Sequence, residues 1–366
     1  MKIIRNISRI LLGLVFIFSG FVKGVDPLGF TYKIIDYLEA FHMEWLEPAA
    51  LSLAVLAIAL EFVIGFALVL NARIKLAAWG NLLFMVFFTI LTFYLALTNP
   101  VTDCGCFGDA IIMTNWETFF KNLILLALSI IVFSSRHKFK PPWKPWVQNI
   151  LVITGFLILF GISFYSYHHL PILDFRAWKK GADMAGEVPP PTVYLIYENK
   201  ETGEQKAWLT EDLPYDEPGF MEKWEFVDQR VIEPDVPETT LRVENEEGVN
   251  VSEQIFDVKG YNFILIAHDL QKADQESMID MDDFYDNCLK DDIAFSALTG
   301  SLYTKSDQYK QENNLDYPFY LADDIALKTV IRSNPGLLLL KDGVIIEKWH
   351  HNDFPEYRQF KTEYMK

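Results

Sequence analysis

The sequence has 366 residues, of which 51% are hydrophobic and 22% charged, with a mean hydropathy of +0.13 and a formal net charge of −17. This combination predicts a membrane half joined to a water-soluble half. Residues 1–170 carry 12 basic and 9 acidic residues, so residues 171–366 carry 20 and 40. The acidic half disfavours nucleic acid as a partner, and three cysteines are too few for a disulfide-stapled scaffold.

Five apolar segments predict membrane spans at roughly Ile7–Val22, Ala49–Leu70, Leu76–Leu97, Phe119–Phe133 and Val147–Tyr165. Most approach the ~20 residues that a helix needs to cross the hydrocarbon core. The first segment has the basic start of a signal peptide but no small-residue cleavage site, so we expect it to be retained. Residues 1–170 therefore form the predicted transmembrane domain, an all-α helical bundle whose first partner is the lipid bilayer.

Basic residues are concentrated on one side of the predicted spans. Residues 1–9, 71–76 and 136–146 carry nine lysines and arginines and no acid, whereas the alternate loops carry eight acids and two lysines. The positive-inside rule then predicts a cytoplasmic N-terminus. Because the number of spans is odd, the acidic half and the loop with Cys104 and Cys106 share an oxidising compartment. We expect a bacterial cytoplasmic (inner) membrane protein with a periplasmic C-terminal domain.

Two ionisable residues in the spans are candidate functional residues. Glu61 lies about 12 residues into the second segment, near mid-bilayer at ~1.5 Å per residue. A charge there costs ~2.5–3.5 kcal/mol, so we expect Glu61 to face the bundle interior. It is a candidate for proton transfer or quinone contact, or else a packing residue held by Asn81 or Ser19. Lys23, at the outer end of the first span, is expected to extend to the membrane interface, with a specific site role as the alternative.

The loop Asn99–Ala110 holds two cysteines, Cys104 and Cys106, separated by one glycine. A disulfide across a single residue closes a small, strained ring, which makes it a labile oxidant. The neighbouring Asp103 and Asp109 would raise the thiol pKa values and so oppose a reactive thiolate. The alternatives are a structural disulfide, two idle thiols or half of a metal site. Zinc would want about four ligands, and no second Cys/His cluster lies nearby, so we predict no metal ligands.

Several of these residues together resemble a known family. Phe18-Ser-Gly-Phe-Val-Lys23 and Asp26-Pro27, then Leu60-Glu61-Phe62 with Gly65, resemble the DoxX/MauE group of small membrane proteins, and the Cys-Gly-Cys-Phe-Gly loop favours MauE. The resemblance covers about residues 1–135. It implies a four-helix core, here with a fifth span, and a role in disulfide formation and maturation of periplasmic proteins. A more distant resemblance to vitamin K epoxide reductase-like enzymes implies quinone as cofactor, but this chain lacks their Cys-x-x-Cys and second cysteine pair.

Residues 171–258 are predicted to hold an interfacial segment and a β-rich region. The stretch from His168 through Arg176 to Gly181 is aromatic, basic and proline-containing, which suits a segment lying on the membrane. Pro189-Pro-Pro191 is expected to act as a stiff spacer. Thr192–Tyr197 and Gln205–Leu209 predict a hairpin, and further short strands are expected at Phe226–Ile232 and Leu241–Val243. This β-rich insert shows no catalytic signature.

Residues 259–366 alternate between predicted strands and helices. The strands are expected at 263–267, 293–298, 317–321, 336–340 and 344–349, and the helices at 275–289, 305–314 and 324–332. Asp323 is the expected N-cap of the last of these helices. Lys341-Asp-Gly343 predicts a closing hairpin, and the alternation as a whole predicts a mixed α/β sheet.

This order resembles the thioredoxin fold, particularly its TlpA- and peroxiredoxin-like branch, over about residues 258–355. Pro335 matches the position of the cis-proline before the final hairpin of that fold. The active-site cysteines of the family would follow the first core strand, where this chain has His268–Asp274 and no thiol. Cys288 is expected to be a half-buried structural residue, with a resolving thiol as the alternative. The resemblance therefore implies a thioredoxin-like domain that binds other proteins.

The leading hypothesis is a membrane protein that exchanges thiols and disulfides with extracytoplasmic clients through Cys104 and Cys106, with quinone as a candidate cofactor. The outer domain would recognise the client. The alternative is a non-catalytic, membrane-anchored subunit of a cell-envelope assembly. The missing thioredoxin cysteines favour the alternative, whereas the Cys-Gly-Cys loop favours the first hypothesis.

Overall fold

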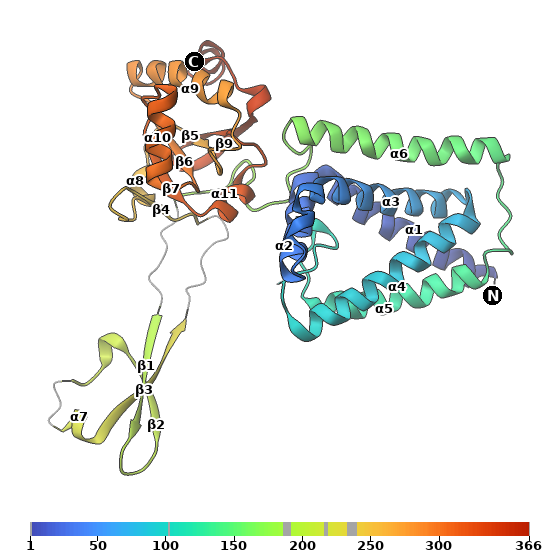
Figure 1. Ribbon diagram of the computed structural model, residues 1–366, viewed down its shortest axis with the longest axis horizontal. Coiled ribbons are helices and arrows are strands. Elements are labelled where there is room, and N and C mark those ends of the chain that lie inside the picture. The colour runs from blue at the N-terminus through green and yellow to red at the C-terminus, as the bar shows by residue number, and fades with distance from the viewer. Residues whose placement is uncertain (1, 102, 186–191, 216–218, 233–239, 366) are drawn as a thin grey trace.

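The computed structural model describes residues 2–101, 103–185, 192–215, 219–232 and 240–365. The predicted spacer Pro189-Pro-Pro191 lies outside these residues. The described part forms a helical bundle, a three-stranded sheet and a six-stranded mixed sheet with its own helices (Figure 1). Membrane-length helices are thus followed by a separate α/β region.

Five helices in the described part of the chain are long and apolar enough to cross a membrane. They are α1 (Lys2–Val25), α3 (Ala50–Leu70) with the 3-10 helix Glu44–Ala49 before it, α4 (Ile74–Thr98), α5 (Asn115–Ser134) and α6 (Pro145–His168). Each overlaps one predicted segment, so the prediction of five such segments is confirmed. Their outer faces are apolar, with Leu83, Ile90 and Ile124 more than 60% exposed. A lipid bilayer would cover these side chains.

Helices α1 and α3 pack closely because glycines line their contact. A Cβ atom at Gly65 would lie 2.6 Å from the backbone nitrogen of Ile17 and 2.7 Å from the carbonyl oxygen of Gly13. Small residues allow such backbone contact between membrane helices. The two helices therefore lie side by side along their lengths, which brings the end of α1 against the middle of α3.

Helix α2 (Pro27–Ala40) was not among the predicted elements. The Asp26 side chain caps it by accepting a hydrogen bond of 2.9 Å from the Gly29 N–H, and Pro27 occupies the first helical position. Both are typical signals of a helix start. The helix lies across the end of the bundle that faces the α/β region (Figure 1). The loop between α4 and α5 lies at this same end.

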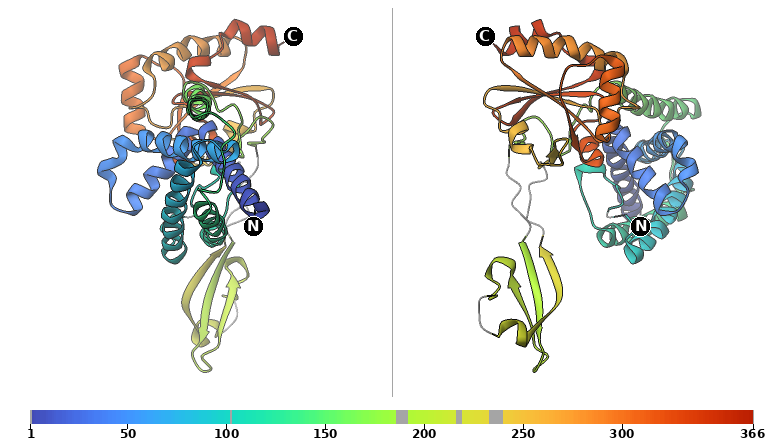
Figure 2. Two further views of the ribbon diagram at one scale, coloured as in Figure 1. Left: turned by 90° about the vertical axis from the view of Figure 1, so that its right-hand side faces the viewer. Right: turned by 60° about the vertical axis from the view of Figure 1, so that its left-hand side comes forward.

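The three-stranded sheet has the order β2-β1-β3, from β1 (Thr192–Asn199), β2 (Gln205–Leu209) and β3 (Trp224–Ile232). Strands β1 and β2 pair antiparallel, which confirms the predicted hairpin. A short helix, α7 (Phe220–Lys223), precedes β3, and Tyr197, Leu213 and Phe220 form a small core. This sheet stands away from the larger one in both views of Figure 2.

The six-stranded sheet has the order β4-β7-β6-β5-β8-β9. Its strands are β4 (Val243–Glu244), β5 (Tyr261–Ile266), β6 (Ala294–Thr299), β7 (Phe319–Ala322), β8 (Gly336–Lys341) and β9 (Val344–His350). Strands β5, β6 and β7 pair in parallel, whereas β4, β8 and β9 join antiparallel. The predicted mixed sheet and its closing hairpin, with Asp342 and Gly343 at positive φ, are confirmed.

Both faces of this sheet are buried, which explains the continuous apolar run of β5. Ile264 and Ile266 face one core, and Phe263 and Leu265 face the other. The covering helices are α8 (Ser252–Phe256), α9 (Gln275–Lys290), α10 (Tyr303–Asn313), α11 (Asp324–Val330) and α12 (Tyr357–Tyr364). Asp323 caps α11 as predicted. Helix α12 was not predicted, although its Phe360 is fully buried.

The segment that follows α6 belongs to this α/β unit. Trp178 and Met184 pack in the same core as Ile264, and the Arg176 side chain is 5% exposed. The prediction that this stretch lies on the membrane is wrong for Arg176 and Trp178, because ion pairs and core packing hold them in the α/β unit. Strand β4 belongs to it as well, so the expected boundary between residues 258 and 259 falls inside the unit.

Candidate functional site: the cysteine loop and its two cavities

Cys104 and Cys106 form a disulfide in the loop between α4 and α5, with their Cα atoms 5.5 Å apart. Gly105 between them has a φ of +60°, a left-handed conformation that favours glycine. The Asp103 side chain accepts a 2.9 Å hydrogen bond from the Gly105 N–H and so fixes the turn. Cys104 is 6% exposed, and Cys106 is partly buried. The loop is therefore an ordered turn that presents the two sulfurs differently.

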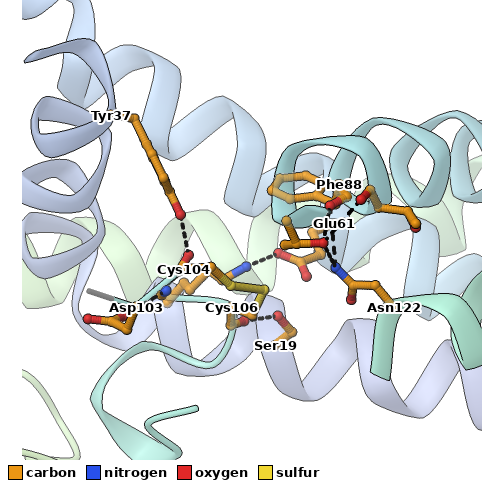
Figure 3. The surroundings of a disulfide bond; sticks show 12 residues. Ser19, Tyr37, Glu61, Phe88, Asp103, Cys104, Cys106 and Asn122 are labelled. Carbon is orange, nitrogen blue, oxygen red and sulfur yellow. Dashed lines mark hydrogen bonds and ion pairs between the residues drawn. A yellow bond between two sulfur atoms is a disulfide. The ribbon is translucent and has the colours of Figure 1, made fainter. Parts of the chain in front are cut away.

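Side chains from α1 and α2 hold this loop at the end of the bundle (Figure 3). Tyr37 donates a 2.8 Å hydrogen bond to the carbonyl oxygen of Cys104, and Ser19 donates one of 2.5 Å to that of Cys106. The Lys33 ammonium lies 2.8 Å from the Asp103 carboxylate. Burial acts to lower the pKa of Lys33, but Asp103 and Asp36 outweigh it and raise that pKa. Both cysteines are thus fixed through hydrogen bonds to their backbone carbonyl oxygens.

Lys23 and Glu61 form an ion pair inside the bundle, next to the disulfide. The Lys23 Nζ and Glu61 Oε2 atoms are 2.6 Å apart, and the two side chains are 4% and 8% exposed. Glu61 faces the interior, as the cost of a charge in lipid requires. The expectation that Lys23 extends to the membrane interface is wrong, because Glu61 offers a buried partner. The alternative partners of Glu61 are also wrong, since Ser19 bonds to Cys106 instead and Asn81 has no described partner.

A small cavity of about 30 Å³ lies inside the bundle behind Cys106. Its lining includes Lys23, Glu61, Lys121 and Asn122, and the Lys121 Nζ atom lies 4.3 Å from the centre of the Phe107 ring. A cavity of this size holds about one or two water molecules. It is far too small for a quinone ring, so the residues lining it do not fit the cofactor that the distant resemblance implied.

A larger cleft of about 790 Å³ lies on the other side of the loop, between the bundle and the α/β unit. Gly105 and Gly108 of the loop line it, opposite His268 and Lys328 of the α/β unit. Lys23 lines both the cleft and the inner cavity. The cysteine loop therefore lies between a cleft of the size of small-molecule sites, ~300–1,000 Å³, and a small cavity within the bundle.

Arg332 lines this cleft and joins the α/β unit to the bundle. Its Nε atom donates to both oxygens of Asp26, at 2.9 and 3.2 Å, and an Nη atom lies 3.4 Å from Asp109 of the cysteine loop. Burial acts to raise the pKa of Asp26, but the Arg332 and Arg176 guanidiniums and the Gly29 N–H outweigh it and lower that pKa. Burial raises the pKa of Asp109 despite Arg332. Asp26 is thus the stronger partner.

A second set of contacts fixes the segment that joins α6 to the α/β unit. The buried Lys348 Nζ lies 3.0 Å from Asp174 and donates to the carbonyl oxygens of Trp178 and Val330, at 2.8 and 2.6 Å. Arg176 also pairs with Asp174, at 2.7 Å. Because Val330 ends α11, these contacts connect the membrane helix α6 to the helix that precedes Arg332.

The α/β unit brings no thiol to the loop. His268–Asp274 follows β5, as predicted, and His268 and Asp269 line the cleft. Cys288 is fully buried under the sheet, and burial, with Asp291 nearby, raises the pKa of its thiol to about 12. The Asn334–Pro335 peptide bond is cis. In the described residues, no group of three or more His, Cys, Asp or Glu side chains is arranged to hold a metal ion.

Sequence reasoning missed Lys121, Arg332 and Tyr37, and it expected Ser19 to contact Glu61 and not the loop. Lys121 could have been found from the sequence, because a lysine inside a membrane span indicates a candidate functional residue. The other three have no local signal, because each acts on a residue far away in the chain.

These features define a membrane protein with a cysteine loop at the end of its helical bundle. Residues 1–135, which span α1 to α5 and include the loop, match the family described as Methylamine utilisation protein MauE. The MauE side of the expected resemblance is thus confirmed, over less than half of the chain. No curated protein and no solved structure matches the chain.

Proposed function

We propose that this protein exchanges thiols and disulfides with extracytoplasmic proteins through Cys104 and Cys106, as an accessory in their maturation. The observation that supports this most is the disulfide itself, held by its backbone between a cleft of about 790 Å³ and a small charged cavity. The name of the matched family refers to methylamine utilisation. An accessory role in maturing another protein is in keeping with that name.

The proposal includes an orientation in the bacterial cytoplasmic membrane. With the N-terminus in the cytoplasm, the end of the bundle that carries α2, the cysteine loop and the α/β unit faces the periplasm. The excess of lysine and arginine in the opposite loops supports this orientation. The periplasm is an oxidising compartment, where a disulfide persists.

The proposed step is a balanced exchange. A client dithiol gives up two electrons and two protons and becomes a disulfide, while the bond between Cys104 and Cys106 breaks and both become thiols. The exchange passes through a mixed disulfide between the client and one of the two cysteines. The small cavity behind Cys106 does not fit a quinone ring, so no quinone step is part of the proposal.

The α/β unit is proposed to be a thioredoxin-like domain that recognises the client without reacting with it. Support comes from the parallel pair β5–β6, the antiparallel hairpin β8–β9 and the cis peptide bond before it. Its only cysteine, Cys288, is buried away from the cleft. His268 and Asp269, which stand where that family carries its cysteines, contribute to the cleft wall instead.

Trapping in native membranes tests the proposal. The Cys106→Ser variant should accumulate covalent adducts through Cys104 on non-reducing gels, and the Cys104→Ser/Cys106→Ser variant is the matched control. Orientation is tested by protease digestion of sealed right-side-out vesicles, which should degrade the α/β unit. A protected α/β unit, or a Cys106→Ser variant without adducts, would contradict the proposal.

A non-catalytic, membrane-anchored subunit of an envelope assembly is the second candidate. The low exposure of Cys104 and the contacts of Arg332 with Asp26 and Asp109 favour it, because they shield the loop. In that case the double cysteine variant would keep its normal phenotype and its partner proteins, and no adduct would form.

A further inference from the structure

The cavity behind Cys106 contains more positive than negative charge. Among the described residues that line it, the charged side chains are Lys23 from α1, Glu61 from α3 and Lys121 from α5. Lys23 and Glu61 neutralise each other at 2.6 Å. Lys121 is part of no ion pair or hydrogen bond within the described chain. One ammonium group is therefore left over beside this small cavity, among mostly apolar and aromatic side chains.

Lys121 is held next to the cysteine loop. It lies six residues into α5, which is ~9 Å along the helix axis at 1.5 Å per residue, and its Nζ atom rests on the ring of Phe107, the residue after Cys106. An aromatic face attracts an ammonium group but does not neutralise it. Lys121 is partly buried, and a cation removed from water without an anion is costly, so the site is suited to an anion that appears during the reaction.

We infer that Lys121 stabilises the thiolate of Cys106, so that Cys106 is the leaving sulfur and Cys104 carries the mixed disulfide. Cys106 lines the inner cavity with Lys121, whereas Cys104 does not. Cys104 itself does not line the cleft from which a client would arrive, but its neighbours Asp103 and Gly105 do. The inference rests on the proposed function and adds the order of attack.

The step balances as follows. A client thiolate attacks the Cys104 sulfur, the bond between the two cysteines breaks, and its electron pair goes to Cys106 as a thiolate facing Lys121. The second client thiolate then attacks the client sulfur of the mixed disulfide and expels Cys104, which takes up a proton. Lys121 is a positioning residue in this scheme because it acts on the reacting sulfur through charge. A stable leaving thiolate speeds the first attack.

The loop also carries two aspartates, whose negative charges would oppose the effect of Lys121 on the Cys106 thiolate. Asp103 and Asp109 belong to the loop, but Lys33 neutralises the first and Arg332 approaches the second. Neither aspartate lines the inner cavity. The charge that Cys106 faces is thus set by Lys23, Glu61 and Lys121. Removing Lys121 leaves the ion pair between Lys23 and Glu61 intact.

The test is the pH dependence of Cys106 alkylation by iodoacetamide. The full chain is purified in detergent with Cys104→Ser and Cys288→Ala, so that Cys106 is its single thiol. Lys121→Met and Lys121→Gln should raise the apparent pKa of this thiol by about one to three units, as expected for losing an opposite charge nearby. Lys121→Arg should restore it. Lys75→Met, the same change at the far end of α4, is the matched control and should leave the thiol pKa unchanged.

Glutathione tests the order of attack in the chain with all its cysteines. Acid-quenched samples, analysed by mass spectrometry after proteolysis, should carry glutathione on Cys104. An unchanged alkylation profile in both Lys121→Met and Lys121→Gln, or glutathione on Cys106, would overturn the inference. Neither measurement needs a client. If the alkylation profile shifts but no client adducts form, the role of Lys121 stands and the proposed function is rejected. If client adducts form but the profile does not shift, the proposed function stands and the role of Lys121 is rejected.

Discussion

The Arg332 guanidinium of the α/β unit binds the Asp26 carboxylate of the membrane half, with Nε 2.9 and 3.2 Å from the two carboxylate oxygens. The same side chain approaches Asp109 in the cysteine loop. One arginine, 5% exposed, therefore joins the bundle, the loop and the α/β unit.

Arg332→Gln should open the cleft. Breaking an ion pair of this kind leaves a charge without its partner, which costs ~3–5 kcal/mol when the pair is fully buried. We expect reduction of the Cys104–Cys106 disulfide by a charged phosphine to be on the order of tenfold faster. The exposed Arg358→Gln on α12 is the matched control. Equal reduction rates in Arg332→Gln and wild type would contradict a closing role for Arg332.

Acid should open the same cleft. Because the docked pKa of Asp26 is lowered, its contribution to docking is complete above the ordinary aspartate pKa, ~3.9, and disappears as the pH falls through the lowered value. Asp109, whose pKa is raised, becomes protonated at a higher pH than Asp26 and there loses its attraction to Arg332. The phosphine reduction rate of the wild type should thus stay low at mildly acidic pH and rise below it. Asp26→Asn should show a fast rate at every pH, and a wild-type rate independent of pH would contradict the mechanism.

Removing one partner of the Lys23–Glu61 pair should destabilise the bundle more than removing both. Lys23→Met or Glu61→Gln leaves a buried charged or polar group alone, at a cost of ~3–5 kcal/mol. The double variant should recover much of this loss, which a double-mutant cycle of melting temperatures in detergent measures. Lys75→Met controls for loss of a lysine at an exposed position. Additive losses in the double variant would show that the two side chains do not depend on each other.

Cys288 should take no part in the exchange. Its thiol is fully buried and its pKa is raised to about 12, so it is protonated at neutral pH. A maleimide should label it only after the protein is denatured. Cys288→Ala should cost about 1 kcal/mol through the small cavity it leaves, with client trapping unchanged. An adduct on Cys288 in the Cys104→Ser/Cys106→Ser variant would assign it a redox role.

The elements could be predicted from sequence where the signal is local. The spans follow from apolar length, and the closing hairpin from Lys341-Asp-Gly343. Helix α2 was missed although Asp26 and Pro27 mark its start. The local environment of Lys23 could not be predicted, because its partner Glu61 is 38 residues away and meets it only through the close packing of α1 on α3. The bond between Arg332 and Asp26 spans 306 residues and depends on how two units dock, for which the sequence carries no pattern.

On the proposed function, the cleft beside the cysteine loop would also select clients by shape. At about 790 Å³ it matches a site for a small molecule, and Arg332 is among its lining residues. A folded domain is too bulky to bring a surface cysteine to the loop while the cleft keeps this form, whereas an extended chain segment can enter. An accessory built this way would act on proteins before they finish folding and leave their mature disulfides untouched.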